Sequence, residues 1–181
     1  MIQLKTPLTK EKTLTLKVGD QILLSGVIYT ARDQGHQRLV NLIDKGEELP
    51  FDLDNQIIYY VGPAPAKPGE IIGSAGPTTS YRMDDLTIPL LKKGLKGMIG
   101  KGKRAPKIID SIVENKAIYF VAIGGAGALI ANCIVKSEVI AFEDLGSEAL
   151  RRLEIKDFPL TVVIDTKGNN LYAIEQKKYK R

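Results

Sequence analysis

The sequence predicts an α/β domain that is built on a mixed sheet. Apolar, β-rich runs lie near both ends of the chain, helix-like and strand-like patterns alternate in the middle, and Gly- or Pro-rich loops separate them. At 181 residues with 44% apolar side chains, the chain is large enough to bury a core of its own. We therefore expect a single domain over residues 1–181.

The first third is expected to contribute a polar edge segment, two buried strands and a helix. Runs of β-branched residues bounded by turn residues predict strands, and apolar residues at helical spacing after a capping residue predict a helix. The expected elements are an edge strand at 14–17 within the polar segment 1–18, strands at 21–30 and 56–61, and a helix that Asp33 begins as N-cap and Gly46 ends.

The remainder is expected to alternate helices with strands and to end in a hairpin. The turn residues at 166–169 indicate the hairpin, and the basic residues 175–181 are expected to be a solvated tail. Pro89 is tolerated only in the first turn of its helix. The expected elements are helices at 86–95, 106–115, 129–134 and 146–153, a short apolar segment at 96–102, strands at 117–123 and 138–142, and hairpin strands at 158–165 and 170–174.

The stretch at 73–84, GSAGPTTSYRMD, has the composition of an anion-binding loop. Gly73 and Gly76 allow the backbone to approach a ligand closely. Residues 78–80 supply three hydroxyl groups, and Arg82 supplies a planar cationic fork that suits a carboxylate or a phosphate. A Gly/Pro loop with a Ser/Thr helix cap explains the same composition equally well.

Three cationic residues, Arg32, Arg82 and Lys101, lie at turn-like points between predicted elements. Strand-to-helix junctions of an α/β layer often open on one edge of the sheet, where ligands bind. We therefore expect these side chains to converge on a small dianion. The alternative, three separate surface charges, is about equally compatible with the composition.

Other candidate residues lie close to these cations. His36, the single histidine, falls in the first turn of the helix after Arg32, and a structural role is as well supported as a chemical one. Asp33 and Asp84 each follow a candidate arginine, so we expect them to cap helices or to orient those arginines. The single cysteine, Cys133, is expected to be a buried, inert thiol, and it excludes an intrachain disulfide or a cysteine-rich metal site.

The net charge of +5 favours an acidic partner or an anionic small molecule. Part of it lies at 177–181, a segment too short and too poor in aromatic residues for a nucleic-acid arm. The Gly-rich run at 124–127 lacks the spacing of a dinucleotide loop, which favours close helix–strand packing. No apolar run is long enough to cross a membrane and no signal peptide is visible, so a cytoplasmic location is expected.

These motifs resemble, in the same order, those of the iron–sulfur hydro-lyases of the class I fumarase and L(+)-tartrate dehydratase family. The similarity runs from about Gly19 to Asn170. Two departures, Lys103 in place of a common asparagine and Ser80-Tyr81 at two variable positions, leave every catalytic position in place. The matching segments are TARDQGH at 30–36 (T-A-R-D-x-x-H), residues 73–84 (G-S-A-G-P-T-T-x-x-R-M-D), the K-G loop at 100–102, and the segments 145–149, 157–159 and 165–169.

The resemblance implies the β subunit, or equally the C-terminal domain of longer members, with a swivelling β/β/α fold. It also implies a partner α subunit that holds a [4Fe–4S] cluster on three cysteines, in an α2β2 assembly, and no metal on this chain. The implied roles are binding of substrate carboxylates by Arg32, Arg82 and Lys101, proton transfer by Thr78, and support by Asp33, His36, Gly76, Thr79 and Asp84.

The implied activity is the reversible hydration of fumarate, a small dicarboxylate, to (S)-malate. One alternative is conversion of tartrate to oxaloacetate by the same kind of subunit. The other is an anion-binding module without chemistry. The sequence does not separate the two reactions well, because both substrates are four-carbon dicarboxylates.

Overall fold

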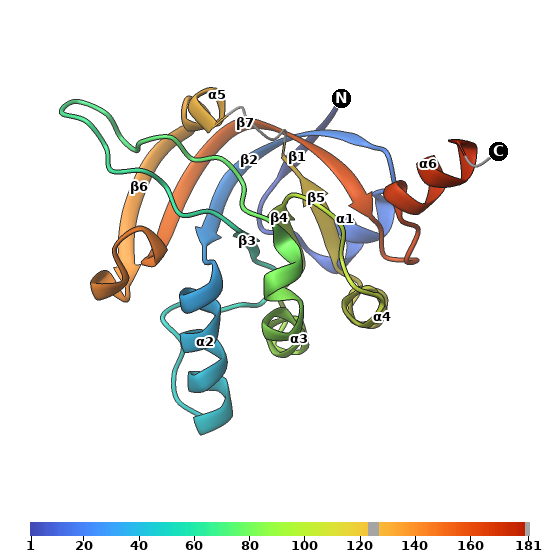
Figure 1. Ribbon diagram of the computed structural model, residues 1–181, viewed down its shortest axis with the longest axis horizontal. Coiled ribbons are helices and arrows are strands. Elements are labelled where there is room, and N and C mark those ends of the chain that lie inside the picture. Colours follow the sequence, from blue (N-terminus) through green and yellow to red (C-terminus); the bar gives the residue numbers. More distant parts are fainter. Residues whose placement is uncertain (123–126, 180–181) are drawn as a thin grey trace.

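Seven strands form one mixed sheet in the computed structural model, which describes residues 1–122 and 127–179 (Figure 1). The strands pair in the order β1-β2-β3-β4-β5-β7-β6, and β7 pairs with β2 as well. This extra pairing closes β2, β3, β4, β5 and β7 into a ring, which β1 and β6 extend. The strands are β1 Ile2–Lys5, β2 Gln21–Thr30, β3 Ile57–Tyr59, β4 Gly97–Gly100, β5 Ile118–Val121, β6 Ile134–Ala141 and β7 Leu150–Ile164.

Strands β1 to β5 run parallel to one another, and β7 runs antiparallel to its neighbours β2, β5 and β6. Successive side chains of a strand point to opposite faces. In β3, Ile57 and Tyr59 belong to the apolar cluster that the ring encloses, whereas Ile58 belongs to a second cluster on the outer face. Because both faces are covered, the central strands β3 and β5 read as continuous apolar runs in the sequence.

Three helices, α2, α3 and α4, cover the outer cluster and lie side by side below the sheet (Figure 1). Short helices precede or follow the strands elsewhere, and two 3-10 turns, η1 and η2, lie next to α3 and β7. The helices are α1 Lys10–Thr15, α2 Asp33–Lys45, α3 Asp84–Lys92, α4 Pro106–Glu114, α5 Gly127–Ala131 and α6 Leu171–Tyr179, with η1 at Ser80–Met83 and η2 at Glu143–Glu148. Among the described residues, no helix has both the length and the apolar character that a membrane span requires.

The α/β class, the mixed sheet and most of the central elements are confirmed. The expected edge strand at 14–17 is wrong, because Leu14 and Thr15 form the end of α1, Leu16 is its C-cap, and the edge strand is β1 instead. Leu14 is 52% exposed, whereas Thr13 and Leu16 are buried, so the burial follows helical rather than strand spacing. The hydroxyl of Thr9 accepts the N–H of Lys12 and caps this helix.

Two expectations near the C-terminus are also wrong. The expected helix at 146–153 is split between η2 and the start of β7, because β7 gains hydrogen-bonded neighbours on both sides, β2 and β6. The expected strand at 170–174 is the start of α6, whose first turn Asn170 caps by accepting the N–H of Tyr172. The expected basic tail therefore begins inside a helix, and residues 180–181 lie outside the described range.

Smaller differences concern the middle of the chain. α3 begins at Asp84, directly after η1, so Pro89 lies inside this helix rather than in its first turn. The apolar segment at 96–102 contains strand β4. Cys133 lies between α5 and β6, half-buried against the inner core, rather than on a helix. The Gly-rich run at 124–127 lies outside the described residues except for Gly127.

Candidate functional site

The carboxyl ends of the parallel strands β2, β3 and β4 lie at one edge of the sheet and place the predicted site residues there. Arg32 follows β2 by two residues, and Lys101 directly follows β4. The carbonyl of Tyr60, just beyond β3, accepts the N–H of Thr78 at 2.8 Å. Thr79 forms a parallel bridge with Lys101. The loop at 73–84 is therefore fastened to the strand ends that precede the predicted cations.

Arg82 joins the two principal motifs through a bidentate ion pair. Its Nε and Nη2 donate to the two carboxylate oxygens of Asp33 at 2.9 and 3.1 Å, and Nη2 also donates to the hydroxyl of Thr78 at 3.0 Å. The hydrogen bond from Arg82 holds the pKa of the Asp33 carboxyl below its ordinary value. Asp33 is the first residue of α2 and not its N-cap, so its side chain orients Arg82 instead.

Arg32 pairs with an acid from a distant part of the chain. Its Nε lies 2.8 Å from Oε1 of Glu148 in η2 and 3.7 Å from Oδ2 of Asp33. The other carboxylate oxygen of Glu148 accepts the N–H of Gln34 at 3.0 Å, so Glu148 also satisfies the first turn of α2. Reasoning from residue types missed Glu148, because a Gly-Ser-Glu-Ala sequence is typical of a helix start.

The arginine pairs leave hydrogen-bond donors for a ligand. Each guanidinium carries five N–H donors, and the contacts described above use only Nε of Arg32 and Nε and Nη2 of Arg82. Within the described part of the chain, no carboxylate lies within 4.0 Å of the ammonium of Lys101. The edge can therefore bind a carboxylate without breaking the internal ion pairs.

Ser80 holds the backbone of Lys101 in place through two hydrogen bonds. Its N–H donates to the carbonyl of Lys101 at 2.9 Å, and its hydroxyl accepts the N–H of Lys101 at 3.1 Å. A Cβ on Gly100 would lie only 1.9 Å from this hydroxyl, so the K-G loop needs glycine there for close packing. Packing also explains Gly73, where a Cβ would lie 2.4 Å from the carbonyl of Ala64.

Asp84 forms a buried ion pair instead of orienting Arg82. Its carboxylate accepts Nε of Arg104 at 2.5 Å and the N–H of Ala105 at 2.8 Å. The Arg104 guanidinium lies over the rings of Tyr60 and Tyr119, at 5.4 and 4.8 Å from the ring centroids. Burial opposes the charge of Arg104, but these neighbours outweigh it and raise the pKa of the guanidinium. No sequence pattern indicates this pair, because Arg104 lies in a basic stretch that is typical of a solvated surface.

His36 is buried beneath the first turn of α2. Its Nδ1 lies 3.0 Å from the carbonyl of Arg32, which it can reach as a donor, and its ring packs edge-on against Tyr60. Burial lowers the pKa of the imidazole from 6.5 to about 4, so the ring is neutral at physiological pH. Within the described structure its Nε2 has no hydrogen-bond partner. His36 thus supports the backbone that carries Arg32 and Asp33.

Substituting His36 by phenylalanine is expected to flatten the pH dependence of stability. Between pH 6.5 and 4 the unfolded imidazole takes up a proton that the folded ring does not, so stability falls as the pH falls. The loss amounts to about 3 kcal/mol between pH 7.5 and 4. Urea unfolding of both proteins at the two pH values measures it. Asp33 also loses stabilisation on acidification, but equally in both proteins, and equal losses in the two proteins would contradict the role of His36.

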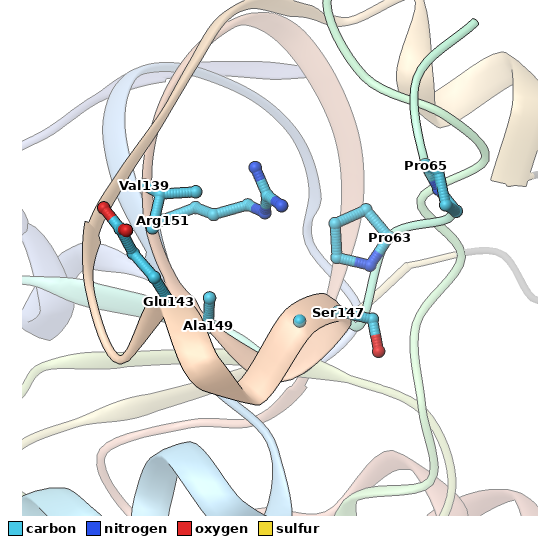
Figure 2. A pocket seen from close by; sticks show the side chains of 8 residues that line it. Pro63, Pro65, Val139, Glu143, Ser147, Ala149 and Arg151 are labelled. Carbon is cyan, nitrogen blue, oxygen red and sulfur yellow. The ribbon is translucent and has the colours of Figure 1, made fainter.

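Two cavities lie beside the predicted site, and neither is lined by Arg32, Thr78, Arg82 or Lys101. One, of about 460 Å³, lies between Pro63 and Arg151 (Figure 2). The other, of about 700 Å³, lies between the loop at 64–74 and α5. The side chains of Arg32 and Arg82 are 31% and 38% exposed and Lys101 is exposed too, so the predicted site residues stand on an open edge of the sheet.

The part of the chain that the structure describes offers no metal-binding cluster of its own. The described residues contain no cluster of three His, Cys, Asp or Glu side chains that could bind an ion. An iron–sulfur cluster needs several thiolates, and the chain has one cysteine. Burial raises the pKa of the Cys133 thiol, which favours its uncharged form. The donor set of this chain does not fit such a cluster.

Comparison with known proteins places this chain among characterised sequences. The family model described as the fumarase C-terminus matches residues 1–175. A proposed L(+)-tartrate dehydratase subunit beta of Methanocaldococcus jannaschii is 38% identical over 94% of this chain and 91% of its own length. Fumarate hydratase 2 of Leishmania major is 35% identical over 95% of the chain, and the anaerobic class I fumarate hydratase of Escherichia coli K12 is 38% identical over 86%.

The extent of these matches differs between the relatives. The chain spans nearly the whole tartrate dehydratase subunit but only 31% and 29% of the two fumarate hydratases. The resemblance drawn from the sequence motifs is confirmed by the family match, which covers almost every described residue. The chain belongs to the fumarase C-terminal family.

Proposed function

We propose that this chain is the β subunit of a class I fumarate hydratase, which interconverts fumarate and (S)-malate together with an α subunit. The observation that carries the proposal is the network of Thr78, Arg82 and Asp33 at the open edge where Arg32 and Lys101 also stand. We further propose that the ring of strands corresponds to the swivelling β/β/α domain of this family, and that the assembly is α2β2.

The proposed chemistry uses the residues of this edge as follows. Dehydrating malate removes a proton next to a carboxylate, so negative charge builds on that carboxylate in the transition state. Arg32, Arg82 and Lys101 supply positive charge for it. The hydroxyl of Thr78 accepts a hydrogen bond from Arg82, which favours the deprotonated oxygen, the form that can take up the proton removed from malate.

The [4Fe–4S] cluster of the proposed enzyme is assigned to the α subunit, because the donor set of this chain does not fit it. The fumarate hydratases that extend well beyond the matched segment support this division of labour, since the rest of their length is available for a second part of the site. The open edge with Arg32 and Lys101 is the surface that the α subunit is proposed to cover.

A second candidate is the β subunit of L(+)-tartrate dehydratase. The observation that favours it is the match over 91% of a relative of that name, which has the length of a separate subunit. Steady-state assays of the assembled enzyme with malate, fumarate and L(+)-tartrate distinguish the two. A kcat/KM that is at least tenfold higher for malate and fumarate supports the first proposal, and the reverse supports the second.

Arg82→Met in the assembled enzyme is expected to lower kcat/KM by about 30- to 1,000-fold, because a lost carboxylate contact costs about 2–4 kcal/mol. The matched control is Arg38→Met, which removes another arginine of a bidentate pair, with Asp144, in which both side chains are exposed. It should leave kinetics within about twofold. Unchanged kinetics in Arg82→Met, with assembly intact, would exclude Arg82 from the site.

Thr78→Ala is expected to lower kcat more than it raises KM, because the proposed proton transfer contributes about 100- to 10,000-fold. Thr79→Ala is the neighbouring control and should be milder, since Thr79 contributes a backbone bridge to Lys101. Steady-state kinetics of both variants in the assembled enzyme make the comparison. The reversed order of effects would shift the proton-transfer role to Thr79.

A further inference from the structure

The cavity of about 460 Å³ beside the predicted site contains an arginine that the proposed reaction does not use (Figure 2). Pro63 and Pro65 form one wall, Val139 of β6 a second, and the segment from Glu143 to Arg151 the remainder. The side chain of Arg151 extends into the space between Val139 and Pro63 (Figure 2). The volume falls in the range of small-molecule sites.

Arg151 differs from the other arginines of the described structure in having no acidic partner. Each of the others forms an ion pair with a carboxylate within 4.0 Å, whereas Arg151 forms none. Its Nε is buried and has no hydrogen-bond partner among the described residues. Burial lowers the pKa of Arg151, although arginine stays charged at physiological pH. A partly buried, unpaired guanidinium is costly, and an anion in the cavity would compensate it.

The backbone holds Arg151 at the same edge as Arg32. The N–H of Arg151 donates to the hydroxyl of Thr30 at 3.1 Å, two residues before Arg32. The cavity wall at Pro63 adjoins Gly62, where a Cβ would lie 2.6 Å from Nη1 of Arg32. The wall at Ser147 adjoins Glu148, which pairs with Arg32. The cavity is therefore a neighbour of the predicted site and shares its supporting residues.

The lining of the cavity defines the chemistry of its ligand. One guanidinium balances one negative charge, whereas a phosphate carries between one and two, and the carboxylate of Glu143 on the same wall repels the more highly charged anion more strongly. Pro63, Pro65, Val139 and Ala149 offer apolar surface, and Ser147 offers a hydroxyl. We propose that the Arg151 cavity binds the carboxylate of a small monocarboxylic acid with an apolar body, at a site separate from the one proposed for the dicarboxylate.

The side-chain Nε–H signals of the uniformly ¹⁵N-labelled chain test this proposal. Butyrate is the probe, inorganic phosphate is the comparison anion, and the signal missing in Arg151→Met identifies Arg151. Butyrate should shift the Arg151 signal saturably and at least tenfold more tightly than phosphate does. Arg151→Met should weaken butyrate binding at least tenfold, as followed by the backbone N–H signals of Ser147 and Ala149.

Two controls make the result decisive. Arg152→Met removes the neighbouring arginine, which pairs with Glu154 and does not line the cavity, and should leave butyrate binding unchanged. Arg151→Lys keeps the charge but not the fork, and should bind with intermediate affinity. No saturable shift, or equal binding in Arg151→Met, overturns the proposal. The proposal is also overturned if the α subunit alone shifts the Arg151 signal and butyrate then causes no further shift. In that case an acidic side chain of the α subunit occupies the cavity. None of these readouts depends on catalytic activity.

Discussion

Malate dehydration is expected only when this chain is combined with an α subunit that carries an iron–sulfur cluster. The isolated chain should be inactive even after anaerobic reconstitution, since one cysteine and one histidine cannot supply the ligands of a cluster. Its own edge offers Arg32, Arg82, Lys101 and the hydroxyl of Thr78, which we propose to bind a dicarboxylate but which supply no group for the leaving hydroxide. Activity should therefore rise from background to full turnover upon mixing.

The measurement compares malate dehydration by the purified chain, reconstituted anaerobically, with and without the α subunit. Cys133→Ala is the matched control, because the thiol lies half-buried between α5 and β6, away from the strand ends that carry the site. That variant should keep full iron content and near-normal turnover in the complex. Robust turnover by the isolated chain would disprove the two-subunit proposal, and iron loss in Cys133→Ala would assign the thiol to the cluster.

The sequence was informative where local patterns and global packing agree. In the run at 56–61, Ile57 and Tyr59 belong to the inner cluster and Ile58 to the outer one, because the parallel part of the sheet is covered on both sides, and β3 lies there. In the run at 21–30, buried side chains alternate with more exposed ones over much of the strand, and β2 lies there. Arg32 and Lys101 follow two parallel strands of the same sheet, β2 and β4, which β3 separates. This placement explains why the chain order of the motifs could predict one edge.

The sequence failed where a partner distant in the chain decides the structure. Residues 147–154, SEALRRLE, have high helix propensity, yet β2 and β6 pair with this segment from both sides and hold most of it as a strand. The pairing of β7 with β2, which closes the ring, depends on a register between segments more than a hundred residues apart. No local pattern specifies such a register.

The ion pairs at the site show the same limitation. Proximity in sequence predicts that Asp33 orients Arg32 and that Asp84 orients Arg82, whereas Asp33 binds Arg82 and Asp84 binds Arg104. Asp33 and Asp84 begin α2 and α3, and each binds an arginine from another segment of the chain. The packing of α2 and α3, rather than neighbours in the chain, therefore determines which arginine each carboxylate binds. The loops that carry the predicted cations are thereby tied together through their acids.

Arg104→Met is expected to lower the free energy of unfolding by about 3–5 kcal/mol, which is the largest expected effect on stability. The substitution leaves the carboxylate of Asp84, only 7% exposed, without the cation that compensates its burial. It also removes the guanidinium from between the rings of Tyr60 and Tyr119. Urea unfolding of the isolated chain at neutral pH measures the loss.

Two comparisons separate the buried charge from the loss of side-chain volume. Arg38→Met removes an arginine that also pairs with a carboxylate and also packs on a ring, that of Phe142, but at the surface, and should cost less than about 1 kcal/mol. Adding Asp84→Asn to Arg104→Met should restore part of the stability, because no unpaired charge then stays buried. A loss below about 1 kcal/mol, or a double variant no more stable than the single one, would contradict the mechanism. In the sequence, Lys101 lies three residues from Arg104, and Arg82 lies two residues from Asp84. Arg104→Met should therefore also weaken malate binding in the assembled enzyme, although Arg104 itself is buried away from the ligand edge.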